Sequence, residues 1–92
     1  MTPDAAETIA LNALGWIVAR DEVAAGLLAA SGAEIGDVGA RAGDPEFLGF
    51  VLDFLLSSED LLVEFCEEAG IPPDAPTRAR AALPGGDLPN WT

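Results

Sequence analysis

Apolar residues recur along most of the chain at spacings of three and four, which is the period of an α-helix. No segment keeps the strict alternation of apolar and polar residues that is typical of a half-buried β-strand. The pattern therefore predicts an all-α protein that folds as a compact bundle of five to six helices. These helices are expected over about 3–19, 21–31, 34–42, 45–56, 57–70 and 75–83.

Several of these helices carry recognisable start and stop signals. In Thr2-Pro3-Asp4 and in Asp44-Pro45-Glu46, a capping side chain precedes a proline at the first helical position and an acid near the positive end of the helix dipole. Gly32 and Gly70 follow the second and fifth helices, where glycine can take the left-handed conformation that ends a helix. Ser57, with an acid three residues later, predicts the N-cap of the fifth helix.

An offset of 38 residues aligns the two halves of the chain without a gap. This alignment predicts two αα-hairpin repeats, with units of about 3–43 and 44–83. We expect the two units to pack with pseudo-twofold symmetry through the first and fourth helices. Identical residues are few, and any two amphipathic hairpins share an apolar pattern. The aligned pairs include Leu14 with Leu52, Ile17 with Leu55, Leu27 with Phe65 and Gly32 with Gly70.

The length and composition of the chain predict a single domain. Half of the 92 residues are apolar, which is enough for one buried core but not for two. We assign this helical domain to residues 1–86 and a C-terminal tail to residues 87–92. Trp91 in the tail either folds back over the bundle or offers a partner an aromatic anchor.

The charge balance is strongly acidic. Sixteen Asp and Glu face four Arg, with no Lys or His, and the formal net charge is −12 at pH 7. Phosphate backbones and anionic lipid repel such a surface, so direct nucleic-acid and membrane binding are not expected, and a basic protein partner fits better. A secretory signal is missing after Met1, and the single Cys66 has no internal disulfide partner, which together predict a cytoplasmic location.

One helix carries an acidic stripe. Residues three and four apart are neighbours on a helix, so the acids of the fifth helix share one face. This stripe is a solvated face, a surface for a basic partner or a place for a hard cation, and since the loop geometry of a calcium site is missing, no metal is predicted. The stripe consists of Asp60, Glu64, Glu67 and Glu68.

Asp53 interrupts the most hydrophobic helix, where an unpaired buried charge would be costly. One interpretation places it on a narrow polar stripe that reaches the surface, because residues 46, 49, 53 and 57 recur at three and four. The other pairs it with Arg20, with Arg41 or with the backbone N–H groups that open a neighbouring helix.

The inventory of catalytic groups is small. The chain has no His, Lys or Tyr, and its hydroxyls lie mostly at predicted helix ends, where capping explains them. Cys66 stands beside Glu64, Glu67 and Glu68, whose charges would raise its pKa and make it a poor nucleophile. We therefore predict that the protein is not an enzyme and holds no cofactor.

Four segments resemble an alphaproteobacterial family of proteins of roughly one hundred residues that is catalogued as a domain of unknown function. The resemblance covers nearly the whole chain and implies a bacterial cytoplasmic protein. It carries over no catalytic or binding residues. The segments are Ala13-Leu14-Gly15-Trp16-Ile17, Asp44-Pro45-Glu46-Phe47-Leu48, Val51-Leu52-Asp53-Phe54-Leu55 and Leu83-Pro84-Gly85-Gly86.

These observations favour a non-enzymatic protein–protein interaction or adaptor module whose partner is an unknown, basic protein or a second copy of the chain. Its contact surface would be the acidic stripe or apolar residues exposed on the first and fourth helices. The alternative is an acidic mimic of nucleic acid that sequesters a basic protein. A polar pocket around Asp53 would instead favour an enzyme.

Overall fold

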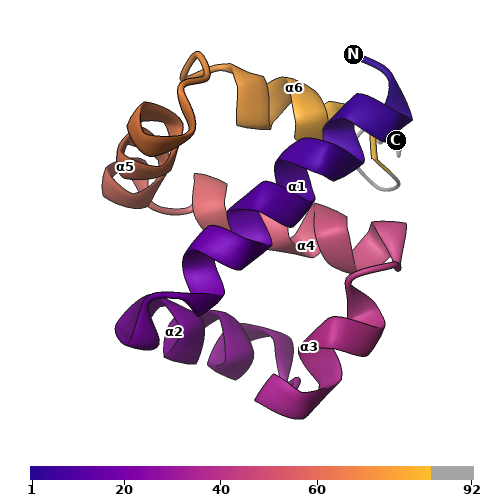
Figure 1. Cartoon of the computed structure of the whole chain (residues 1–92), viewed down its shortest axis with the longest axis vertical. Helices are drawn as coiled ribbons and strands as arrows, with labels where there is room; N and C mark the ends of the chain where they lie inside the picture. Colours follow the sequence, from indigo (N-terminus) through magenta and orange to yellow (C-terminus); the bar gives the residue numbers. More distant parts are fainter. Residues whose placement is uncertain (84–92) are drawn as a thin grey trace, which may run out of the picture.

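The computed structural model describes residues 1–83, and Trp91 and the predicted tail 87–92 lie outside this range. The described residues form a bundle of α-helices without strands, as the hydrophobic pattern predicted (Figure 1). The helices are α1 (Pro3–Val18), α2 (Asp21–Ser31), α3 (Ile35–Arg41), α4 (Pro45–Leu56), α5 (Glu59–Ala69) and α6 (Ala75–Ala81).

The predicted start and stop signals lie where the helices begin and end. Thr2 Oγ1 accepts a hydrogen bond from the backbone N–H of Ala5 at 3.1 Å, which caps α1. Asp44 caps α4 in the same way. Gly32 and Gly70 take left-handed conformations, with φ of 73° and 71°, and end α2 and α5.

The predicted N-cap of α5 is wrong by one residue. Ser58, rather than Ser57, has the extended backbone of an N-cap, and its Oγ accepts from the N–H of Leu61 at 3.4 Å. Ser57 still has helical backbone angles, and its N–H donates to the carbonyl of Asp53, because α4 continues to this point. Ser57 therefore ends one helix, and its neighbour begins the next.

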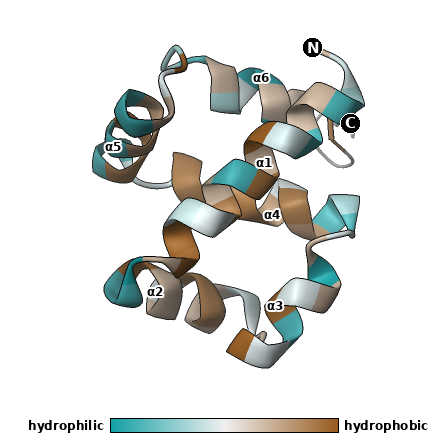
Figure 2. Cartoon of the chain, in the orientation of Figure 1, coloured by the Kyte–Doolittle hydropathy of each residue, from teal (hydrophilic) through white to brown (hydrophobic). Residues whose placement is uncertain are grey.

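The core forms where α1 crosses α4 (Figure 1). Figure 2 shows α4 as a largely hydrophobic helix, and its Leu48, Val51, Leu52 and Leu55 are at most 1% exposed. On α1 the buried positions at helical spacing are mostly alanines, which let the two helices approach closely. The predicted contact between the first and fourth helices is thus confirmed. The buried alanines of α1 are Ala6, Ala10 and Ala13.

The helix boundaries follow the 38-residue offset. Helices α2 and α5 have equal lengths and begin at Asp21 and Glu59, while α1 and α4 end at Val18 and Leu56. Helices α3 and α6 are also equal in length but are shifted by two further positions. The starts of α1 and α4 are 42 positions apart, and the repeat units and their pseudo-twofold arrangement remain predictions.

The last helix of each half packs differently. Helix α6 packs against both α1 and α4 and buries Ala75, Pro76 and Ala79. Helix α3 buries only Val38 and has the least extensive packing of the six helices. The bundle is therefore closed by α6 on one side and only partly covered by α3 on the other.

Candidate functional site

The acidic stripe of α5 faces away from the core. Asp60, Glu64, Glu67 and Glu68 are all exposed, whereas Phe65 and Cys66 on the other side of the helix are buried. Burial of this apolar face orients α5, so the same packing that holds the helix turns its carboxylates outward.

Glu68 differs from the other members of the stripe. Its Oε1 accepts a hydrogen bond from Arg20 Nη2 at 2.7 Å. The guanidinium of Arg20 also lies 4.0 Å from the ring centroid of Trp16 and donates to the carbonyl of Trp16. Trp16 in turn meets Phe65 edge-on, with ring centroids 5.8 Å apart. This cluster ties α5 to the end of α1, so we read Glu68 as a residue that positions the stripe.

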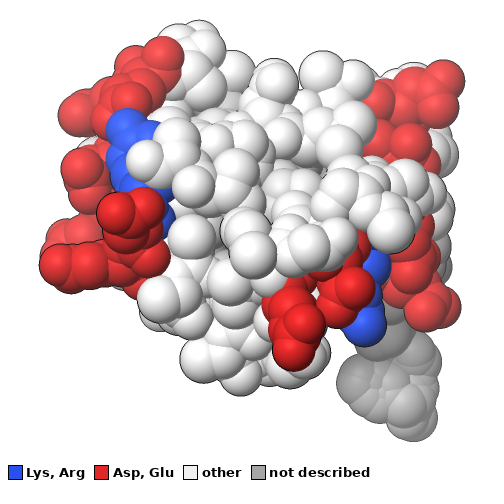
Figure 3. Space-filling view, turned by 60° about the horizontal axis from the view of Figure 1, so that its bottom comes forward, with Lys and Arg blue, Asp and Glu red and all other residues white. Residues whose placement is uncertain are grey.

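The remaining stripe residues, Asp60, Glu64 and Glu67, form no ion pair within residues 1–83. Figure 3 shows acidic side chains gathered toward the edges of one face of the molecule, with a broad uncharged region in the centre. The negative charge is therefore concentrated in patches, which attract cationic groups more strongly than an even distribution would.

Asp53 is both exposed and paired. Its side chain is 53% exposed, and its Oδ1 accepts a hydrogen bond from Arg80 Nε at 2.7 Å. The predicted partners Arg20 and Arg41 are wrong, since Arg20 binds Glu68 and Arg41 lies over the ring of Phe47. The ion pair forms because α6 folds across α4, a contact between residues 27 positions apart in the chain.

Gly49 lies one helical turn before Asp53 and is buried beneath the same arginine. A Cβ atom at this position would stand 2.8 Å from Arg80 Nη1. The expected polar stripe therefore does not reach the surface at Gly49, because Arg80 covers it. Glycine in the middle of a helix lowers stability, so its presence there can indicate that another group approaches the backbone closely. Gly49 itself was the only sign of this contact in the sequence.

Cys66 is 2% exposed. Burial raises the pKa of its thiol, and the negative charge of Asp74 raises it further. The predicted direction of the pKa shift is confirmed, but its causes are burial and Asp74 rather than the glutamates of α5. A buried thiol that holds its proton tightly is a poor nucleophile.

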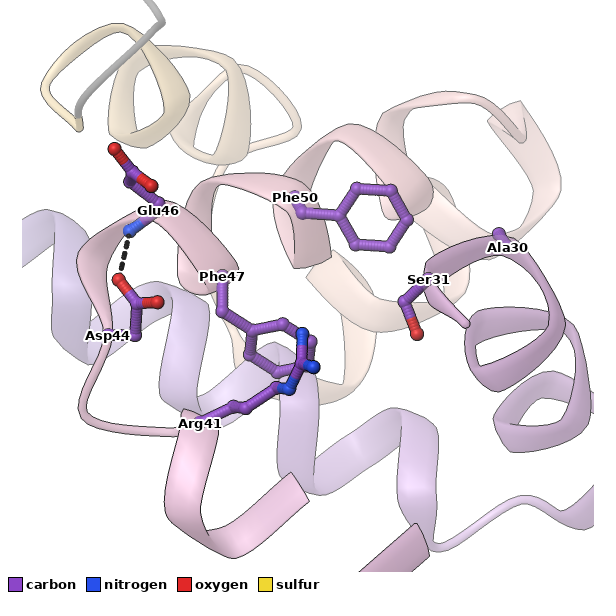
Figure 4. Close-up of a pocket in the computed structure, with 7 residues that line it drawn as sticks. All are labelled: Ala30, Ser31, Arg41, Asp44, Glu46, Phe47 and Phe50. Carbon is purple, nitrogen blue, oxygen red and sulfur yellow. Dashed lines mark hydrogen bonds between the residues drawn. The ribbon is translucent and has the colours of Figure 1, made fainter. Parts of the chain in front are cut away.

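A pocket of about 290 Å³ opens between the end of α2, the end of α3 and the start of α4 (Figure 4). The rings of Phe47 and Phe50 form its apolar wall, and Figure 4 shows the guanidinium of Arg41 beside the ring of Phe47. Asp53 is not among the lining residues, so this pocket is not the polar site that would have favoured an enzyme. The other lining residues are Ala30, Ser31, Asp44 and Glu46.

The pocket was not predicted, because it depends on how the ends of α2 and α3 approach α4 and leave Phe50 partly exposed. Within residues 1–83, no three His, Cys, Asp or Glu side chains come together in a group that could hold a metal ion. No single helix in this range is long and apolar enough to cross a membrane. Helices α2 and α3 reach that length and composition only as a pair, which is bent by 74°.

The chain belongs to the family described as Protein of unknown function (DUF3572), whose model matches residues 3–86. No curated protein and no solved structure matches the chain. Membership in a family of unknown function is thus confirmed, while the alphaproteobacterial origin and the cytoplasmic location stay predictions. The family description names no activity or ligand.

Proposed function

We propose that this member of the DUF3572 family is a non-enzymatic interaction module that binds a basic protein through α5. One observation carries the proposal. Asp60, Glu64 and Glu67 share an exposed face of a helix that is anchored by its buried side, and they have no ion-pair partner within residues 1–83. A fixed row of unneutralised carboxylates binds and steers Lys- or Arg-rich partners.

The distribution of polar groups supports binding rather than catalysis. In residues 1–83 no polar or charged side chain is buried as a potential acid, base or nucleophile, apart from the thiol of Cys66. The sequence also contains no His, Lys or Tyr. Surface carboxylates in high dielectric stabilise reacting charges weakly, but they suffice to attract an oppositely charged surface.

A second copy of the chain does not fit this surface. Two molecules of net charge −12 repel each other, and the repulsion is strongest where acidic patches would meet. Large exposed hydrophobic residues are also scattered, and within residues 1–83 none of them belongs to α4. These residues are Met1, Leu11, Ile35 and Val63. The partner is therefore taken to be another, basic protein.

Affinity capture from a native bacterial lysate tests the proposal with two matched variants. The first carries Asp60→Asn, Glu64→Gln and Glu67→Gln, and keeps Glu68 because Arg20 needs it. The control removes the same charge elsewhere through Asp4→Asn, Asp21→Asn and Glu22→Gln, which are exposed positions on α1 and α2. We expect a basic protein to be captured by the wild type and the control but not by the α5 variant. Equal capture by both variants would contradict the role of α5.

Mimicry of nucleic acid is a second candidate function, favoured by the regular row of carboxylates along one helix face. In this case the captured protein would itself bind DNA or RNA, and a short duplex would compete with the chain for it. Binding would also weaken steeply with salt. If neither DNA nor RNA displaces the captured protein, the chain is not a mimic of nucleic acid. The proposal of an interaction module would then remain.

A further inference from the structure

The pocket between α2, α3 and α4 leaves part of one aromatic side chain exposed. Helix α3 is short, contains Gly36 and Gly39 and buries only Val38. It therefore packs less extensively against α4 than α6 does. Phe50 consequently remains partly exposed in a pocket of about 290 Å³.

Most polar groups around the pocket already have partners. Ser31 Oγ donates to the carbonyl of Leu28 and accepts from the N–H of Ala33, which completes the end of α2. Asp44 Oδ1 accepts from the N–H of Glu46 at the start of α4. Phe47 is only 6% exposed and lies under Arg41, so two features remain for recognition, namely the exposed part of the Phe50 ring and the charges at the rim (Figure 4).

We propose that this pocket receives one apolar side chain, of the size of leucine or phenylalanine, from a basic segment of a partner protein. Apolar anchors that fill aromatic pockets dominate the binding energy of many protein interfaces. Asp44 and Glu46 outnumber Arg41 at the rim, and the whole chain carries a net charge of −12, so cationic residues beside the anchor are favoured. The inference rests on the proposed function, because it takes the partner to be basic.

Other occupants fit less well. A volume of about 290 Å³ lies at the lower end of the range of small-molecule sites, which usually enclose most of their ligand. A second copy of the chain would bring like charges to a rim that is already acidic. A single apolar side chain leaves room in the pocket for part of the cationic segment that presents it, and such a segment matches the acidic rim.

The test uses three synthetic peptides of about 16 residues and the full chain. The first is an amphipathic helix with leucines on one face and lysines on the other, the second replaces the leucines by serine, and the third replaces the lysines by glutamate. Each is titrated by calorimetry into the wild type, Ala30→Trp and Ala29→Trp. Ala30 lines the pocket, whereas Ala29 is exposed on the same helix and does not, so the two tryptophan variants differ only in whether they obstruct the pocket. Circular dichroism verifies that both variants keep their helices.

We expect only the leucine–lysine peptide to bind well, with affinity reduced at least tenfold by Ala30→Trp and less than about twofold by Ala29→Trp. If the serine–lysine peptide binds as well as the leucine–lysine peptide and Ala30→Trp does not weaken it, the role of the pocket is wrong. The proposed binding of a basic partner would not be contradicted by this result. Pocket-dependent binding of the leucine–glutamate peptide would instead overturn the cationic flank. Binding of no peptide, or concentration-dependent dimerisation that Ala30→Trp abolishes in sedimentation, would overturn the inference.

Discussion

Helices α3 and α6 have equal lengths and follow helices of equal lengths, yet they pack differently against the rest of the bundle. Helix α6 closes the core and supplies Arg80 to Asp53 on α4. Helix α3 buries one side chain and leaves a pocket beside the start of α4. The difference shows that the apolar surface that a helix presents to its neighbours, rather than its length or place in a repeat, decides whether it seals a core or leaves a site open.

The largest effect is expected from placing the same polar side chain on the two helices. Ala79 on α6 is 0% exposed, whereas Ala40 on α3 is exposed. Ala79→Gln both overfills the core and buries an amide, so it should lower the free energy of unfolding by about 3 kcal/mol. Ala40→Gln should change it by less than about 0.5 kcal/mol. Urea unfolding followed by circular dichroism measures both, and similar losses would remove the distinction between the closed and open sides.

The glycines that precede these helices should respond alike. Gly32 and Gly70 both have positive φ, so alanine at either position should lower the free energy of unfolding by about 1 to 2 kcal/mol. Gly36→Ala in α3 is the control, since φ there is not positive and a Cβ would meet nothing, and it should stabilise by about 0.5 to 1 kcal/mol. Thermal unfolding compares the three variants. A loss at Gly70 alone would mean that the first hairpin tolerates a different end to α2.

The contact of Arg80 with α4 should appear as a coupling between substitutions. Gly49→Ala improves helix propensity but pushes against the guanidinium that binds Asp53. We therefore expect Gly49→Ala to be about 1 kcal/mol less favourable in the wild type than in an Arg80→Ala background. A double-mutant cycle in urea measures this coupling. A value near zero would show that Arg80 moves aside without loss.

The smallest effect concerns pH. The pKa of Cys66 is raised in the folded chain, so above about pH 8.5 the unfolded chain loses the thiol proton first and stability falls. Between pH 7 and pH 9 the fall amounts to at most about 0.8 kcal/mol. The chain has no His, Lys or Tyr that would titrate there, and Cys66→Ala should remove the pH dependence. If the stability of Cys66→Ala falls by the same amount between pH 7 and pH 9, a group other than Cys66 causes the pH dependence.

Much of the fold could be predicted because its signals are local. Thr2 and Asp44 cap helices through residues two or three positions away, and Gly32 and Gly70 end helices through their own backbone angles. The misplaced cap at Ser57 marks the limit of this reasoning, since both neighbouring serines offer the same side chain and only the end of α4 selects between them.

The acidic stripe of α5 could also be predicted, because helical spacing alone places its carboxylates on one face. Its division into three acids without an ion pair in residues 1–83 and one anchored residue could not, since Glu68 meets an arginine 48 positions away. The partner of Asp53 was missed for the same reason. With four arginines and sixteen acids, composition allows many pairings, and only the packing of the helices selects among them.

The amino-acid sequence by itself determined the helices, most of their ends, the central contact of α1 with α4 and the acidic face of α5, because each follows from helical period, capping or local composition. Only the tertiary structure decided that Arg80 covers Gly49 and binds Asp53, and that α3 leaves a pocket beside Phe50. These features depend on the approach of distant segments, which is set by the competition of all apolar faces for one core.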